Sequence, residues 1–185
     1  LLVATTVAQS QSLCALLTAV DGGTTIVNVT EVARQAASSG TPQPHAEEVV
    51  FDGCRLNDGT ALLLDFSDVP SGAHVVARFD KLVARGAVNV VVAPPHRRGA
   101  TATVAVLGAD VDVTDSVGFF VVIAANVSNT HLVVAGSNIA VVAAANATTL
   151  VDGLIGVVSL AAVVHNTYPR TVSNCSVSVV GSRIV

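Results

Sequence analysis

The sequence predicts an all-β fold, a right-handed parallel β-helix with a short N-terminal helix. Three observations support this prediction: apolar blocks recur about every 20 residues, Val is abundant while aromatic residues make up only 3%, and polar turn residues separate strand-sized apolar runs. Val favours strands because its β-branched side chain suits a pleated surface and loses rotamers in a helix. An all-β sandwich is the alternative fold.

The repeat is clearest between Val111 and Val185. Four blocks each open on an aliphatic residue and close on Ser, and they begin at Val111, Leu132, Leu154 and Val177. We therefore expect about five coils of about 22 residues. The closing serines of these blocks should stack in one column: Ser116, Ser137, Ser159 and Ser182.

Residues 1–48 are expected to form an N-terminal cap or leading segment. Thr30–Gly40 predicts its short helix, since Thr30 can cap the first turn, Gly40 can end the helix and Pro42 prevents its continuation. Such a helix can cover the open end of a stack of strands or lie along its side, where it protects strand edges.

Residues 49–185 are expected to form the coils, and no linker composition divides them. Turn signals separate the runs, among them Asn57-Asp58-Gly59 and the loop Pro94–Gly99. The expected strands are Val49–Phe51, Leu62–Ser67, His74–Val83, Ala87–Ala93, Ala100–Leu107, Val117–Ala124, Asn138–Ala145 and Leu160–His165.

Charge and hydropathy bear on the class of partner. The net charge is −4 with only nine basic residues, and Arg97-Arg98 is too small a cluster to hold a phosphate backbone, so nucleic acid is not an expected partner. The stretch Ser116–Val151 has no charge between Asp115 and Asp152, which leaves a membrane-embedded segment as one alternative. Polar residues interrupt this stretch before any apolar run reaches the ~18 residues of a spanning helix.

Three cysteines leave at least one thiol unpaired within the chain. Cys14 and Cys54 can pair, but spacing alone does not show it, and buried free thiols are the preferred interpretation.

Asparagines suggest two competing roles. Four of them meet the glycosylation pattern: Asn28, Asn126, Asn146 and Asn174. The series Asn126, Asn146 and Asn166 is evenly spaced, which predicts a ladder of stacked side-chain amides inside the turns. We therefore favour Asn28 and Asn174 as glycan sites and the series as structural.

Asp110, Asp112 and Asp115 form the tightest acidic cluster. Asp110 and Asp112 share one face of a strand, and paired carboxylates on a β-helix can act as acid and base on a polysaccharide. Such an enzyme would need a further charged group from a neighbouring coil, such as Arg85 or Arg97-Arg98. We take solvent-facing acids as the simpler interpretation.

No catalytic residue, metal site or cofactor is predicted. The five histidines lack metal-ligand spacing, and no nucleophile or phosphate-loop motif occurs. His45 beside Glu47 and Glu48 is interpreted as a solvated loop, and His131 and His165 as turn residues.

Two tracts resemble the dispersed gene family of trypanosome surface proteins. They are the run Leu62–His74 and the Val/Ala/Asn-rich tract that contains Asn174–Ser182, and the likeness covers most of residues 49–185. The resemblance implies a pectin-lyase-like β-helix, a cell-surface or secretory location, glycosylation, and a parent protein anchored in the membrane outside this segment.

The functional expectation follows from architecture and resemblance together. We expect a non-enzymatic segment of a large cell-surface glycoprotein, adhesive or structural, whose partner is a host matrix protein or glycan. A polysaccharide-active enzyme that uses the acidic cluster is the first alternative, and the membrane-embedded segment is the second.

Overall fold

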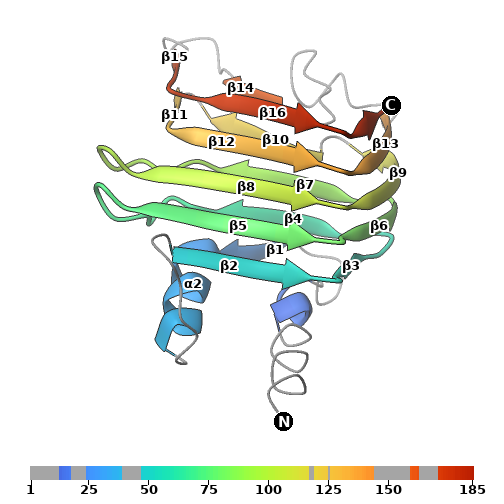
Figure 1. The fold of residues 1–185 in the computed structure, drawn as a ribbon, viewed down its shortest axis with the longest axis horizontal. Helices are drawn as coiled ribbons and strands as arrows, with labels where there is room; N and C mark the ends of the chain where they lie inside the picture. Colours follow the sequence, from blue (N-terminus) through green and yellow to red (C-terminus); the bar gives the residue numbers. More distant parts are fainter. Residues whose placement is uncertain are drawn as a thin grey trace.

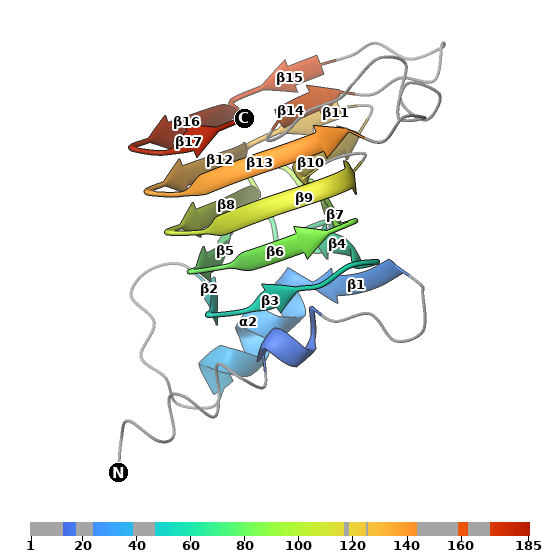
Figure 2. The ribbon, with the colours of Figure 1, turned by 90° about the vertical axis from the view of Figure 1, so that its right-hand side faces the viewer.

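The chain forms a parallel β-solenoid, mostly strand with little helix, in which three sheets stack around one core (Figure 1). The computed structural model describes residues 13–17, 24–38, 47–116, 119–124, 126–143, 159–162 and 171–185. In Figure 1 each coil crosses the front of the view from left to right and returns behind it while the chain climbs, which makes the coil right-handed (Figures 1 and 2). The predicted parallel β-helix is confirmed.

Each main sheet contains five parallel strands. Sheet A contains β1 (Thr24–Asn28), β4 (Ala61–Asp65), β7 (Asn89–Ala93), β10 (Phe119–Ala124) and β14 (Ser159–Ala162). Sheet B contains β2 (Glu47–Asp52), β5 (His74–Asp80), β8 (Thr101–Leu107), β12 (Thr130–Ala135) and β16 (Ser176–Val180). Sheet C contains β3 (Arg55–Leu56), β6 (Val83–Gly86), β9 (Asp110–Ser116), β13 (Asn138–Ala143) and β17 (Arg183–Ile184). A small sheet D pairs β11 (Asn126–Ser128) with β15 (Thr171–Ser173).

The coil is longer than predicted. In sheet B the sequence numbers of paired positions differ by 75−47 = 28, by 101−74 = 27 and by 130−102 = 28, and the last step is 176−131 = 45. Three successive coils run from β2 to β10, followed by β12 to β14 and then by β16 and β17. The expected coil length of about 22 residues is therefore too short, since the regular steps are 27 or 28 residues.

The coil length was underestimated because strands of different sheets carry the same alternating apolar pattern. Val111–Ser116 belongs to β9 of sheet C, whereas Leu132 belongs to β12 of sheet B. The blocks that begin at Leu132 and Val177 are true equivalents, since these two residues pair between β12 and β16, whereas Leu154 lies outside the described residues. The two serines that close these blocks do stack, and the Ser137 N–H donates to Ser182 Oγ at 3.1 Å. Ser116 and Ser159 lie in other strands, so the four-serine column is wrong.

The core contains every Phe of the chain, although aromatic residues make up only 3% of the sequence. Phe51 and Phe79 pair across β2 and β5, with ring centroids 4.8 Å apart, and Phe79 lies 5.3 Å from Phe120. Phe120 follows Phe119 with a positive φ of 55°, at the point where the β10–β7 register shifts. This irregularity buries two successive rings, which a regular strand would send to opposite faces.

One turn position repeats between sheets B and C in the left-handed backbone conformation. It is occupied by Gly53, Lys81, Gly108, Gly136 and Gly181, all with positive φ. Lys81 thus ends β5 at Asp80, which divides the predicted strand His74–Val83 in two.

Helix α2 (Val29–Ser38) lies at the N-terminal end of the stack, with Val29 and Ala33 buried (Figure 1). Its cap is Asn28 rather than Thr30, since Asn28 Oδ1 accepts the Glu31 N–H at 3.0 Å. The Thr30 hydroxyl is buried and has no hydrogen-bond partner within the described chain. The predicted end at Gly40 lies outside the described residues. Strand β1, just before α2, joins sheet A beside β4.

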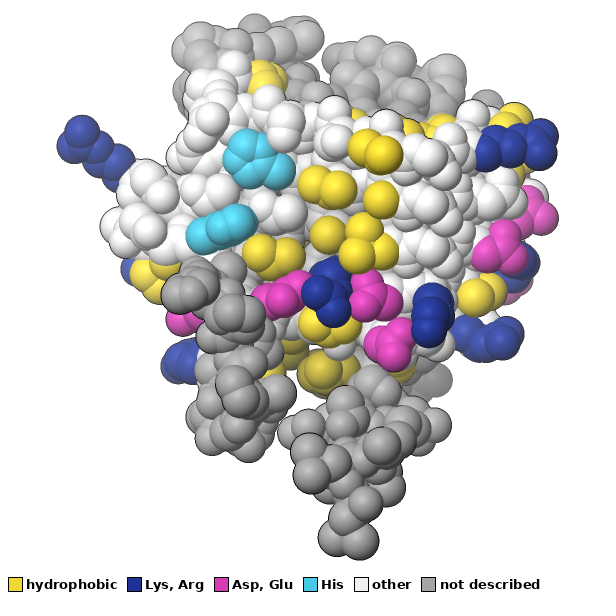
Figure 3. All heavy atoms as spheres, in the orientation of Figure 1, with side chains coloured by type: hydrophobic (Ala, Val, Ile, Leu, Met, Phe, Trp, Pro, Cys, Tyr) yellow, Lys and Arg dark blue, Asp and Glu magenta, His cyan; other side chains and the backbone are white. Residues whose placement is uncertain are grey.

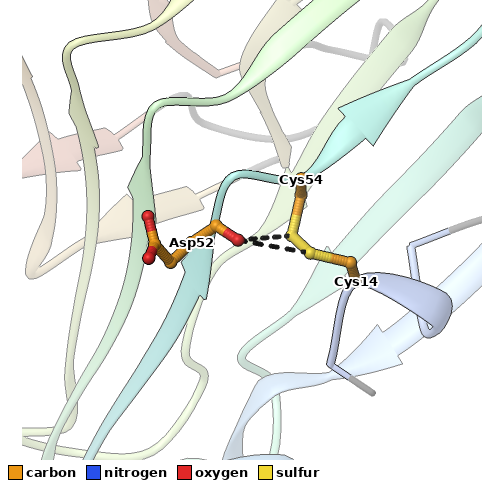
Figure 4. The surroundings of a disulfide bond; sticks show 3 residues. All are labelled: Cys14, Asp52 and Cys54. Carbon is orange, nitrogen blue, oxygen red and sulfur yellow. Dashed lines mark hydrogen bonds between the residues drawn. A yellow bond between two sulfur atoms is a disulfide. The ribbon is translucent and has the colours of Figure 1, made fainter. Parts of the chain in front are cut away.

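A disulfide joins Cys14 to Cys54, so the preferred interpretation of buried free thiols is wrong for this pair. It ties the segment 13–17 to the turn between β2 and β3 (Figure 4). The Asp52 carbonyl oxygen lies 3.6 Å from the Cys14 sulfur and 4.0 Å from that of Cys54. Because bridged sulfurs carry no proton, these are close contacts rather than donated hydrogen bonds. Cys175 is the free thiol among the described residues.

Across the described residues, no helix has the length and apolar character needed to cross a membrane.

Replacing Phe79 by Ala should strongly destabilise the fold. The change removes a ring that touches two other rings, and a Phe→Ala cavity costs about 3–5 kcal/mol. Thermal unfolding should show a Tm lowered by roughly 6–20 °C. Val76→Ala, on the outward face of the same strand, is the matched control and should cost far less. Equal losses in both variants would contradict the packing described here.

Removing the disulfide should also lower the free energy of unfolding. The bridge closes a loop with a sequence separation of 40, for which chain entropy predicts about 4 kcal/mol. Cys14→Ser or Cys54→Ser should therefore lower the Tm by roughly 8–16 °C in calorimetry. Cys175→Ser should leave the Tm nearly unchanged, and a loss as large as that of the bridge variants would argue against this pairing.

Candidate functional site

A shallow groove of about 270 Å³ lies on the outer face of sheet C. It is built from β6, β9, β13 and β17, whose in-register positions bring residues of four coils side by side. Arg85 lies opposite Asp112, while Asp110 lies in line with Asn138 and Arg183. The groove thus alternates cationic, anionic and amide side chains, with Ala140 and Val185 also in its lining.

Arg85 and Asp110 form the central ion pair. Arg85 Nη2 pairs with the Asp110 carboxylate, and Nη1 donates to the carbonyl oxygens of Asp110 at 2.8 Å and of Ala84 at 2.9 Å. Asn138 Nδ2 lies 3.5 Å from Asp110 Oδ1. These contacts fix one guanidinium and one carboxylate between neighbouring coils.

The same contacts lower the pKa of Asp110 below its ordinary value. The hydrogen bond from Arg85 is the largest cause, the hydrogen bond from Asn138 and the charge of Arg85 act in the same direction, and desolvation opposes them. Asp110 is therefore a stable anion, which suits it to hold a cationic or hydroxyl group rather than to donate a proton.

The three acids of the predicted cluster do not act together. Asp112 shares the outer face with Asp110 and lines the groove, as strand periodicity predicted. Asp115 has a positive φ of 49°, near the place where the β13–β9 register shifts, and it does not line the groove. Arg85 is the basic group from a neighbouring coil that the acidic pair required, and Arg97 and Arg98 are exposed in their loop outside the groove.

The asparagine predictions fall on different parts of the structure. Asn28 caps α2, and its Nδ2 donates to Asp68 Oδ2 at 3.0 Å. Asn126 lies in register with Thr171, and Asn146 and Asn166 lie outside the described residues, so that ladder stays a prediction.

An amide pair forms at a different asparagine. Asn174 Nδ2 donates to Asn129 Oδ1 at 2.6 Å, and both residues have positive φ. Sequence reasoning missed this pair because its two members are separated by the long coil step of 45 and not by the assumed period. The amide nitrogen of Asn174 that a glycan would occupy is thus a donor here.

Two of the described histidines, His74 and His131, each lie beside a hydroxyl group of the next coil. His74 Nε2 and Thr103 Oγ1 are 2.9 Å apart, and His131 Nδ1 and Ser176 Oγ are 2.8 Å apart. Glu48 pairs with Arg78 rather than with a histidine, and His45 and His165 lie outside the described residues. Within the described ranges no three His, Cys, Asp or Glu side chains are grouped to hold a metal ion.

Replacing Arg85 by Gln should raise the pKa of Asp110 toward its ordinary value. Because the folded pKa lies below the unfolded one, the pair stabilises the fold above the ordinary pKa, and this contribution is lost as the pH falls through the folded pKa. Carboxyl-carbon NMR titration measures the shift directly. Arg97→Gln, in an exposed loop, is the control and should leave the titration of Asp110 unchanged.

In comparisons with known proteins, no protein-family model, curated protein or solved structure matches the chain.

Proposed function

We propose that this chain is a non-enzymatic segment of a large cell-surface glycoprotein, and that its solenoid wall is an adhesive contact surface. The observation that supports this most is a flat group of partly exposed aliphatic side chains on the outer face of sheet B. We term it the aliphatic wall; it consists of Val76, Ala105, Leu107, Val133 and Ala135.

The in-register pairing of β8 with β12 places most of these side chains next to one another. Ala105 lies opposite Val133, and Leu107 lies opposite Ala135, so that β8 and β12 place four aliphatic side chains in a square. Figure 3 shows hydrophobic side chains in the centre of this face, with charged side chains below them and histidines to one side. The charged group includes Arg78, which lies 3.0 Å from Glu48 and 3.2 Å from Asp80.

A wall of this kind suits protein contact for a physical reason. All of its side chains except Leu107 are Ala or Val and project from paired strands, so that binding orders few rotamers and costs little entropy. An apolar centre with a polar and charged rim is also the usual anatomy of a protein interface. A matrix protein is therefore the partner class that the wall fits best.

Location and family remain part of the proposal. The resemblance of residues 49–185 to trypanosome surface proteins implies a membrane-anchored, glycosylated parent, and the Cys14–Cys54 disulfide fits an oxidising compartment without establishing one. An extended side wall also suits multivalent, individually weak binding.

The groove on sheet C supports the alternative function. Asp112 and the ionised Asp110 face solvent beside Arg85, an arrangement that a polysaccharide-active enzyme can use. Asp110 is a poor general acid because its pKa is lowered, so an acid–base pair would need a proton donor from elsewhere.

The adhesive proposal is tested by binding to immobilised matrix proteins and glycans. Val133→Glu places a charge in the centre of the aliphatic wall and should weaken matrix-protein binding at least about tenfold. Val91→Glu, an outward position on β7 of sheet A, is the matched control and should bind normally. Equal binding by both variants and the unchanged chain would exclude this wall as the contact surface.

A cleavage assay separates the two functions. The unchanged chain and Asp112→Ala should both leave uronide-containing and neutral glycans intact. Robust cleavage that is lost in Asp112→Ala would replace the adhesive proposal with the enzyme.

A further inference from the structure

A second hollow lies between the first turn of α2 and the loop 66–73, which joins β4 to β5. Its volume is about 380 Å³, within the range of small-molecule sites in proteins. It shares no lining residue with the groove on sheet C or with the aliphatic wall. The residues that line it are Asn28, Thr30, Glu31, Arg34, Asp68 and Pro70.

A network of hydrogen bonds holds the polar side chains of this hollow in place. Asn28 Nδ2 donates to Asp68 Oδ2 at 3.0 Å, which joins the start of the helix to the loop. Asn28 Oδ1 accepts the Glu31 N–H at 3.0 Å. The Glu31 carboxylate accepts a hydrogen bond from Gln35 Nε2 at 2.8 Å and pairs with Arg34. Two carboxylates and a guanidinium are therefore already ordered, so that a ligand would order few of them on binding.

The Thr30 hydroxyl is the group of this hollow that the fold leaves unpaired. The Thr30 side chain lines the hollow and the residue is only 9% exposed. Its oxygen has no hydrogen-bond partner within the described chain. A buried hydroxyl without a partner costs folding free energy, and in a native protein such a group indicates a bound molecule that supplies the partner.

We propose that this hollow binds a neutral mono- or disaccharide. A sugar hydroxyl can donate and accept at the same time, so that it can pair with carboxylates, a guanidinium and a hydroxyl group in one site. Glu31 and Asp68 accept hydrogen bonds from the sugar, Arg34 donates to it, and Thr30 gains its missing partner. The Pro70 side chain adds an apolar surface for the C–H groups of the sugar ring.

The charges of the hollow favour a neutral ligand over an ion. Two carboxylates against one guanidinium leave the lining net negative, which disfavours phosphate, sulfate and uronate groups. Arg34 beside Glu31 disfavours a divalent cation, because the guanidinium would lie next to the metal. Within the described part of the chain, no three His, Cys, Asp or Glu side chains are grouped to hold one.

Titration of the isotope-labelled chain, followed by its amide NMR signals, tests the proposal. The probes are glucose, galactose, mannose, N-acetylglucosamine and lactose, with inorganic phosphate and calcium chloride as the competing ligand classes. We expect at least one sugar to cause saturable shifts of amide signals in the first turn of α2 and in the loop 66–73. No such shift with any sugar, or saturation there by phosphate or calcium alone, would overturn the proposal.

Asp68→Asn tests the carboxylate of the loop. The amide can still accept the hydrogen bond of Asn28, but it lacks the charge, so the affinity for the sugar should fall about tenfold. Asp52→Asn, at an exposed position outside the hollow, is the matched control and should bind normally. Val133→Glu in the aliphatic wall should also bind the sugar normally, which separates this site from matrix adhesion. Equal affinity of Asp68→Asn and the unchanged chain would contradict the site.

Thr30→Val separates a ligand from a partner within the fold. Val has nearly the same shape as Thr without the hydroxyl, so the Tm should stay the same or rise, because the fold gives this hydroxyl no partner. The affinity for the sugar should fall by about fivefold or more. A clearly lowered Tm would show that the hydroxyl is paired within the fold, and would overturn its assignment to a ligand.

Discussion

Parallel pairing of each coil with the next is the interaction on which the rest of this structure depends. A single coil cannot bury its own apolar face, since its three strands leave both sides of every inward side chain open along the axis. The strands of the coils above and below cover these inward side chains. Accordingly, buried residues alternate with partly exposed ones along β5, β8 and β12. Backbone hydrogen bonding and core packing are therefore satisfied together or not at all.

This constraint explains where unusual backbone and unusual side chains occur. The corner between sheets B and C needs a residue with positive φ in every coil, and Gly fills it four times in five because it has no Cβ to clash. Lys81 is the exception. The register shift at Phe119 and Phe120 likewise places two rings in the core, where the aromatic side chains of an otherwise Val- and Ala-rich interior gather.

The proposed contact surfaces lie on the outer faces of the sheets, because the inward side chains of the described strands are packed in the core. Stacking places outward side chains of successive coils beside one another on the surface. Examples are the ion pair of Arg85 with Asp110 and the aliphatic side chains of β8 and β12. The groove on sheet C and the wall on sheet B are thus two surfaces of one rigid body. Their different chemistry, charged in one case and aliphatic in the other, is what separates an enzyme from an adhesive scaffold.

Only part of the site around Asp110 and Asp112 could be predicted from the sequence. That Asp110 and Asp112 share a face follows from the alternation of side chains along a strand, which is local. That Arg85 lies beside them depends on the true coil step, and the shorter step assumed from the sequence would have placed a different residue there. Asp115 was grouped with them because it is close in sequence, and the structure shows that its backbone turns there with a positive φ.

The sequence alone determined the fold class, the strand-sized apolar runs and the short N-terminal helix, since these follow from Val content, alternation and local turn chemistry. Only the tertiary structure decided the coil length, the Cys14–Cys54 bridge, the Asn28 cap and the Asn129–Asn174 pair. Each of these is a choice of partner among chemically similar candidates. Strands of all three sheets have the same alternating apolar pattern in the sequence, and only their pairing in the folded chain shows which sheet each one joins.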